Sequence, residues 1–304
     1  MRDDVCADAS PLPSSGLLHL QARAAELGSL LGPTCAALCG VIASHAWPLN
    51  SADLVNLPLL LLLVDGGWGT IWAALAGTDW SMPIRRWRSW DSDSVTGRLP
   101  YTLPGSMGHR MSRWLGKLAT WWQSAFWPVC GPAVQAAVVG LPLTALLAVI
   151  LGPKLLLLST AAVALMQMAV LWKGGDGTVP TGWDGVIGVT LPWMAGHAVF
   201  GGPTVPSTIL ALLLGVAWGS TWSPASAGAS TALILAEVSA ALGLVALRRP
   251  LAAGFVLLAL APQMALLPWA SAGEAKEGRL KASRFVCYSR PWLMGVMVVA
   301  AFAL

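Results

Sequence analysis

Apolar residues in this chain gather in long runs, and short segments rich in Gly, Pro, Arg and Lys separate one run from the next. A helix needs roughly 17–25 mostly apolar residues to cross the ~30 Å hydrocarbon core of a bilayer. The pattern therefore predicts an all-α polytopic membrane protein, with about nine transmembrane helices in a single integral membrane domain over residues 1–304. The predicted spans are 27–47, 54–77, 128–151, 155–172, 185–201, 205–222, 228–247, 250–271 and 286–304.

The composition agrees with a lipid environment. Of the 304 residues, 56% are hydrophobic and only 11% are charged. A soluble domain carries about 25% charged residues, so this chain cannot form an ordinary water-facing surface. Disorder is excluded for the same reason, because disordered chains are polar and highly charged. We expect membrane lipids and other membrane-protein subunits as partners, and no nucleic acid.

The distribution of Lys and Arg predicts the orientation in the membrane. Basic residues are concentrated between the second and third predicted spans and between the eighth and ninth. Short loops rich in Lys and Arg face the cytoplasm, and an odd number of spans places these two loops on the same side. This predicts a cytoplasmic N-terminus and a C-terminus on the opposite side. Arg248 and Arg249 then fall on the non-cytoplasmic side, against the general rule.

The cytosolic loop over residues 80–127 has a pattern of its own. Residues 107–127 place large apolar side chains at helical spacing and basic side chains mostly on another face, which is typical of a helix lying in the membrane interface. Residues 80–90 alternate Trp with Arg, and both side chains favour the headgroup layer. Four arginines of this loop are candidates for binding lipid headgroups or other anions: Arg85, Arg86, Arg88 and Arg98.

Three stretches resemble the UbiA-type intramembrane prenyltransferases. Residues 182–222 are similar to the fifth and sixth helices of that family, with an apolar Pro-containing helix, a Gly-Gly break and a further helix. Residues 32–80 resemble the first helical hairpin, and Gly97-Arg98-Leu99-Pro100 is similar to the element that follows the first catalytic motif. The resemblance implies an isoprenyl diphosphate held by Mg²⁺, with carboxylates at the cytosolic ends of the second and sixth helices.

The acidic residues depart from the family pattern. Asp65 and Asp79 lie 14 residues apart at the first position, about four helical turns, so they cannot hold one ion from one straight helix. The second position, residues 215–224, contains no carboxylate. The candidate catalytic residues are Asp79, Asp91 and Asp93, which would bind Mg²⁺ if the protein is catalytic. No other metal site is predicted.

Three functions follow from these observations. The first is a catalytically degenerate UbiA-like protein that serves as an accessory or scaffold subunit of a larger membrane complex, with an isoprenoid, quinone or pigment as ligand. The alternative is an active, diverged Mg²⁺-dependent prenyltransferase that acts on a lipophilic acceptor. The third is a small-solute or proton-coupled transporter with Asp65 and Glu237 as coupling acids.

A few polar and aromatic residues inside the apolar runs are candidates for a ligand site. Asp65, Trp68, Trp72 and Glu237 are candidates for lining a cavity, since an ionisable group in a membrane helix needs a partner or a polar cavity. Close helix packing through a structural hydrogen bond is the alternative for both acids. His45 and His197 are candidate haem or pigment ligands, or else hydrogen-bonded packing residues.

Overall fold

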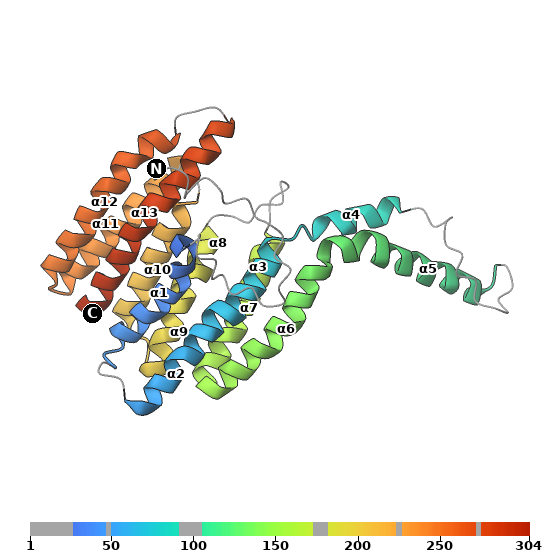
Figure 1. Cartoon of the computed structure of the whole chain (residues 1–304), viewed down its shortest axis with the longest axis horizontal. Coiled ribbons are helices and arrows are strands. Elements are labelled where there is room, and N and C mark those ends of the chain that lie inside the picture. Colours follow the sequence, from blue (N-terminus) through green and yellow to red (C-terminus); the bar gives the residue numbers. More distant parts are fainter. Residues whose placement is uncertain (1–26, 47–49, 91–104, 173–181, 223–226, 272–274) are drawn as a thin grey trace.

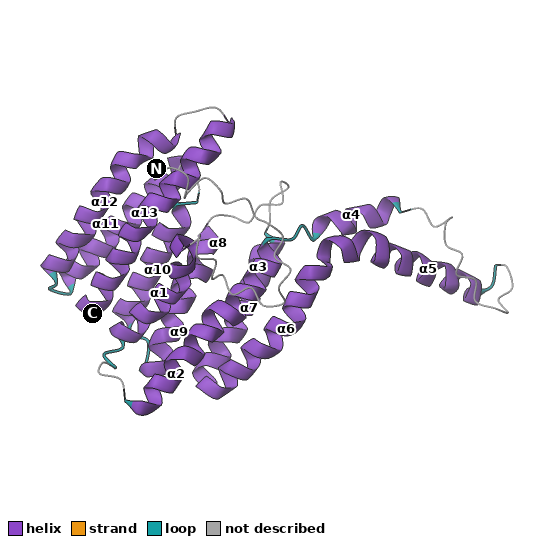
Figure 2. Ribbon diagram, in the orientation of Figure 1, coloured by secondary structure: helices purple, strands orange, loops and turns teal. Residues whose placement is uncertain are grey.

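The computed structural model describes residues 27–46, 50–90, 105–172, 182–222, 227–271 and 275–304. Within these ranges every regular element is a helix (Figure 2). The predicted all-α fold is therefore confirmed for the part of the chain that the structure describes.

Several helices follow one another without a break, and three of them contain a stretch of wider π-helical turns. One continuous helix consists of α2 (Ser51–Leu61), η2 (Leu62–Gly69) and α3 (Thr70–Ala76); we call it helix 51–76. A second consists of α5 (Met107–Trp121), η3 (Trp122–Phe126) and α6 (Trp127–Leu151), and a third, helix 182–200, of α8 (Gly182–Gly185), η4 (Val186–Thr190) and α9 (Leu191–Phe200). The others are α1 (Leu27–Ala43), α4 (Ser81–Ser89), α7 (Pro153–Leu171), α10 (Val205–Ser220), α11 (Ala227–Ala246), α12 (Pro250–Ser271) and α13 (Ala275–Ala303).

Helix ends coincide with capping and turn residues. The side chain of Asn50 accepts a hydrogen bond from the backbone N–H of Asp53 at 2.9 Å, and the Asp53 carboxylate accepts one from the Asn50 N–H at 3.2 Å. This reciprocal capping box begins α2. Between α6 and α7, Gly152 has φ +112°, a conformation that other residues rarely adopt, and Pro153 begins the next helix.

The described helices include six that are long and apolar enough to cross a membrane. Two shorter apolar helices, Gly32–Ala43 and Val205–Ser220, accompany them. The structure thus supports a helical integral membrane protein, whereas the larger number of nine spans stays a prediction. The six long segments are Asp53–Ala76, Met107–Leu151, Pro153–Leu171, Gly228–Ala246, Pro250–Pro268 and Arg284–Ala303.

Helix α1 packs between the two halves of the bundle. It contacts α9, α13 and helix 51–76, while α10 to α13 form one side of the bundle and α6 and α7 lie on the other (Figure 1). Glycines bring the backbones of α1 and α9 together: a Cβ at Gly40 would lie 2.0 Å from the carbonyl oxygen of Trp193, and one at Gly196 would lie 2.1 Å from that of Ala37. Small residues at such crossings are characteristic of membrane helix packing.

Helices α4 and α5 extend sideways from the bundle (Figure 1). We call them, together with η3, the arm; it covers residues 81–89 and 107–126. Both parts of the predicted interfacial loop are therefore helical, and α5 continues through η3 into α6. Their location in the membrane interface stays a prediction.

Candidate functional site

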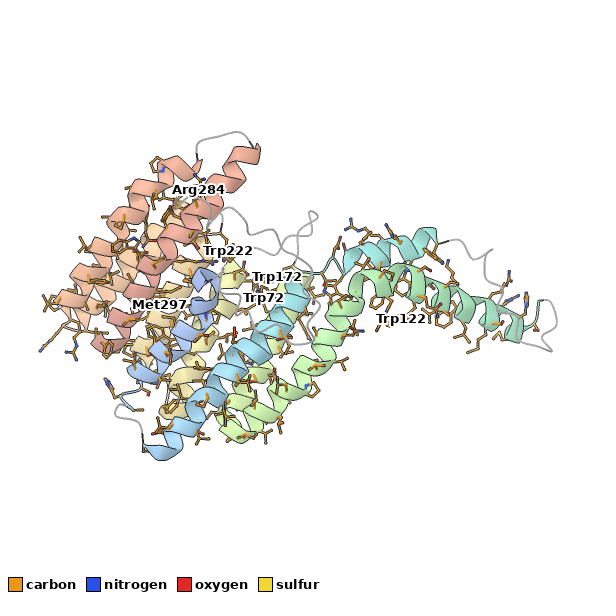
Figure 3. The ribbon with its side chains drawn as sticks, in the orientation of Figure 1. Trp72, Trp122, Trp172, Trp222, Arg284 and Met297 are labelled. Carbon is orange, nitrogen blue, oxygen red and sulfur yellow. The ribbon has the colours of Figure 1, made fainter. Side chains whose placement is uncertain are left out.

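A cavity of about 340 Å³ lies between helices that are distant in the sequence. Its walls come from α1, helix 51–76, helix 182–200, the C-terminal end of α10 and α13. Trp72 and Trp222 of the wall lie towards the same end of the bundle (Figure 3). The wall combines four tryptophans and several apolar residues with three ionisable groups. Its members are Pro33, Val64, Asp65, Trp68, Gly69, Trp72, Asp184, Ile187, Gly188, Trp218, Trp222 and Arg290.

Two carboxylates from different helices line this cavity. Asp65 belongs to η2 and Asp184 to α8, and both side chains are half-buried. The indole Nε1 of Trp72 donates a hydrogen bond to Oδ1 of Asp184 at 3.3 Å. Local π-helical turns such as η2 are frequent at functional sites, because they redirect side chains that a regular helix would place elsewhere.

Among the described lining residues, one arginine supplies positive charge. Arg290 lies in α13 and is only 4% exposed. Its guanidinium carbon is 4.4 Å from the ring centre of Trp222 and 5.0 Å from that of Trp218. An arginine stacked on aromatic faces keeps its planar N–H groups in a fixed orientation, and the cation–π attraction increases when water is excluded. The two tryptophans therefore hold a positively charged hydrogen-bond donor at the cavity.

Trp68 offers a second donor. Its side chain is 2% exposed and lines the cavity, and its buried Nε1 has no hydrogen-bond partner among the described residues. A buried polar group without a partner is costly, so a ligand oxygen that accepts from this N–H would be stabilised. Acceptors on Asp65 and Asp184 and donors on Trp68 and Arg290 thus share one cavity.

Of the four sequence-based candidates for a cavity lining, Asp65, Trp68 and Trp72 share this cavity. Glu237 lies elsewhere: it is buried in α11, and Nε2 of Gln263 in α12 donates a hydrogen bond to its Oε1 at 2.7 Å. The two intramembrane acids named from the sequence therefore do not line the same cavity. Glu237 instead links α11 to α12 through a buried polar contact.

Asp79 caps the beginning of α4. Its Oδ1 accepts hydrogen bonds from the hydroxyl of Ser81 at 2.6 Å and from the backbone N–H groups of Ser81 at 3.0 Å and Met82 at 3.2 Å. These hydrogen bonds hold the pKa of the Asp79 carboxyl below its usual value, and the bond from the Ser81 hydroxyl has the largest effect. Asp91 and Asp93, which the sequence grouped with Asp79, lie outside the described residues.

The predicted anion-binding arginines belong mainly to the arm. Arg85 and Arg86 are exposed on α4, and Arg85 donates a hydrogen bond to the hydroxyl of Ser81. Arg88 belongs to the same helix, whereas Arg98 lies outside the described residues. Neither Arg85 nor Arg86 lines the cavity, where the cation among the described residues is Arg290.

The two candidate haem or pigment ligands differ in exposure. His45 is exposed after the end of α1, whereas His197 is buried in α9. Neither ring nitrogen of His197 has a hydrogen-bond partner in the described part of the chain. Over the same residues, no group of three or more His, Cys, Asp or Glu side chains is arranged to hold a metal ion.

Asp184 and Arg290 were missing from the sequence-based candidates. Arg290 had a detectable signal, because it stands inside the predicted ninth span, where a charged side chain marks a functional site by default. Asp184 stands in a Gly-rich segment at a predicted span boundary, and nothing in its local sequence distinguishes it from an ordinary loop residue.

A second, apolar groove of about 230 Å³ lies between α10 and α11. It contains one polar side chain, Ser239, and no charged one. It therefore lacks the convergent polar groups that define the first cavity. Its lining residues are Val205, Pro206, Ile209, Leu210, Leu213, Ser239, Gly243, Ala246 and Leu247.

The fold and the first cavity together define a class: a helical membrane protein with a mixed aromatic and polar cavity between its helices. Comparison with known protein families, with characterised proteins and with solved structures gives no match.

Proposed function

We propose that this chain is a UbiA-like membrane protein that binds a prenylated quinone in the cavity and serves as an accessory subunit of a larger membrane complex, without catalysing prenyl transfer. In this proposal the chain crosses the membrane nine times, with its N-terminus in the cytoplasm and its C-terminus on the opposite side.

The single observation that carries the proposal is the wall around Arg290. Where the family resemblance implies a second acidic cluster at the end of α10, the chain contributes Trp218 and Trp222, and both stack on Arg290. An aromatic and cationic wall suits a flat, conjugated head group with oxygen acceptors better than it suits a hydrated metal ion.

The charges of the wall favour a neutral head group. Among the described residues of the wall, Asp65 and Asp184 can carry two negative charges, and Arg290 one positive charge. A diphosphate without a cation would meet this excess of negative charge and be repelled. A quinone is neutral, its carbonyl oxygens can accept from Trp68 and Arg290, and the hydroxyls of the reduced form can donate to the carboxylates. The apolar wall then accommodates the prenyl chain.

Binding of a short-chain quinone tests this proposal. The purified chain in phosphatidylcholine nanodiscs should bind ubiquinone-2 saturably, and Arg290→Gln should weaken the affinity by roughly tenfold or more, the effect expected for a buried charged donor. Trp68→Phe keeps an aromatic ring but removes the N–H, so it supplies a second test if Arg290→Gln fails to fold. Arg249→Gln, an exposed arginine at the turn between α11 and α12, is the matched control. Absence of saturable binding by the wild-type chain would overturn the proposal.

One observation favours the alternative, an active Mg²⁺-dependent prenyltransferase. Asp65 and Asp184 line one cavity, and Mg²⁺ is commonly held by one or two carboxylates together with substrate phosphates. Mg²⁺-dependent release of diphosphate from farnesyl diphosphate, lost in both Asp65→Asn and Asp184→Asn, would establish this function. Saturable quinone binding without such release favours the accessory role.

A further inference from the structure

The two helices of the arm form one unit, although a segment of the chain separates them. The rings of Trp87 in α4 and Trp121 in α5 meet edge to face, with their centres 5.4 Å apart. The indole Nε1 of Trp121 also donates a hydrogen bond to the backbone carbonyl of Pro83 at 3.0 Å. At the base of the arm, the ring of Phe126 stacks on that of Trp122 at 4.4 Å. The two contacts of Trp121 fix α4 along α5 as both leave the bundle (Figure 1).

A continuous apolar stripe of α5 and η3 remains exposed. Its five members recur at helical spacing and therefore share one face. Between 42% and 82% of each of these side chains is exposed, although α4 packs against another face of the same helix. The stripe consists of Met107, Met111, Trp114, Leu115 and Trp122.

Cations flank this stripe. Arg110 and Arg113 are exposed on α5, and Nζ of Lys117 lies 5.0 Å from the ring centre of Trp87. Arg85 and Arg86 add two exposed cations on α4. Residues 80–90 and 105–127 contain no Asp or Glu. Asp79, at the start of α4, lies near Arg85, so the cations of α5 supply most of the positive charge of the arm. A uniformly cationic helix pair with an exposed apolar stripe and several tryptophans is complementary to an anionic bilayer surface.

We propose that the arm is a binding site for anionic phospholipids. The stripe enters the boundary between headgroups and acyl chains, and Arg110, Arg113 and Lys117 contact the phosphates of neighbouring lipids. The arm leaves the bundle where α3 ends and α6 begins, and Trp72 of the cavity wall lies in α3. The lipids that the arm gathers therefore belong to the leaflet nearest the Trp72 side of the cavity. This inference does not depend on the quinone proposal.

Hydrogen exchange of the full chain tests this inference. The protein is compared in nanodiscs of pure phosphatidylcholine and of equal parts phosphatidylcholine and phosphatidylglycerol. Peptides from residues 107–121 should exchange more slowly in the anionic nanodiscs. We expect the exchange rate to fall by roughly tenfold or more, because three cations are attracted to the anionic surface. A triple variant, Arg110→Gln with Arg113→Gln and Lys117→Gln, should lose this difference. The matched control, Arg248→Gln with Arg249→Gln at the α11–α12 turn, should keep it.

Two results would overturn the inference. One is equal exchange of residues 107–121 in both nanodiscs, which is also the result expected if the stripe is instead covered by a protein subunit. The other is a lipid-dependent difference that survives in the triple variant. If the triple variant does not fold, a salt titration of the wild-type chain takes its place. The difference in exchange between the two nanodiscs should shrink as the sodium chloride concentration is raised, because salt screens exposed charges. A difference that does not depend on salt would contradict anionic lipid binding.

Discussion

The indole nitrogen of Trp72 donates a hydrogen bond to the Asp184 carboxylate at 3.3 Å, across 112 positions of the chain. This bond links helix 51–76 to helix 182–200 at the wall of the cavity. Because the bond engages Oδ1 of Asp184, it fixes the orientation of the carboxylate at the cavity. One contact thus both supports the fold and orients a group of the candidate site.

Removing this donor should destabilise the protein modestly. Trp72→Phe keeps an aromatic ring but removes the N–H, so the free energy of unfolding in mild detergent should fall by about 1 kcal/mol. Trp114→Phe, on the exposed stripe of the arm, is the control and should change it little. A double-mutant cycle with Asp184→Ala, which removes the acceptor, measures the coupling, and a coupling energy of zero would show that this hydrogen bond contributes nothing.

Close packing of α1 against α9 predicts a strong effect at Gly196. In Gly196→Ala the new methyl group would lie 2.1 Å from the carbonyl oxygen of Ala37, so the helices must separate. We expect a loss of about 1–3 kcal/mol in stability, seen as a lower midpoint of thermal unfolding. Gly254→Ala is the control, because a methyl group there meets no atom within 4 Å, and helix propensity should make it neutral or slightly stabilising. Equal midpoints for the two variants would contradict this packing.

The buried contact between Glu237 and Gln263 predicts an asymmetry between single and double substitutions. Gln263→Met removes the partner of a buried carboxyl group and should cost about 1–3 kcal/mol of stability. Adding Glu237→Met should recover most of this loss, because replacing both partners with apolar groups of similar size leaves no unsatisfied polar atom. Unfolding of the two variants in the same detergent makes the comparison. A double variant that is less stable than Gln263→Met would indicate that Glu237 has another role in the fold.

The membrane-spanning helices could be predicted from the sequence, because the length and apolar composition of each run are local properties of that run. The sequence also grouped Asp65, Trp68 and Trp72, which follow one another at intervals of three and four residues and so share one helix face. Asp184 and Arg290 line the same cavity from two other helices. The spacing of residues within one helix cannot show which residues of other helices lie next to it. The arm shows the same limit, since a helix was predicted over residues 107–127, but neither the helix over residues 81–89 nor the packing of Trp87 on Trp121 was.

The location of a bound quinone tests the central claim most directly. A photoactivatable analogue of ubiquinone-2 is cross-linked to the chain in nanodiscs, and the modified peptides are mapped by mass spectrometry with unlabelled ubiquinone-2 as competitor. We expect competable cross-links on helix 51–76, helix 182–200 and α13, near Trp68, Asp184 and Arg290. Competable cross-links confined to the apolar groove between α10 and α11, or no competable cross-links at all, would contradict quinone binding in the cavity.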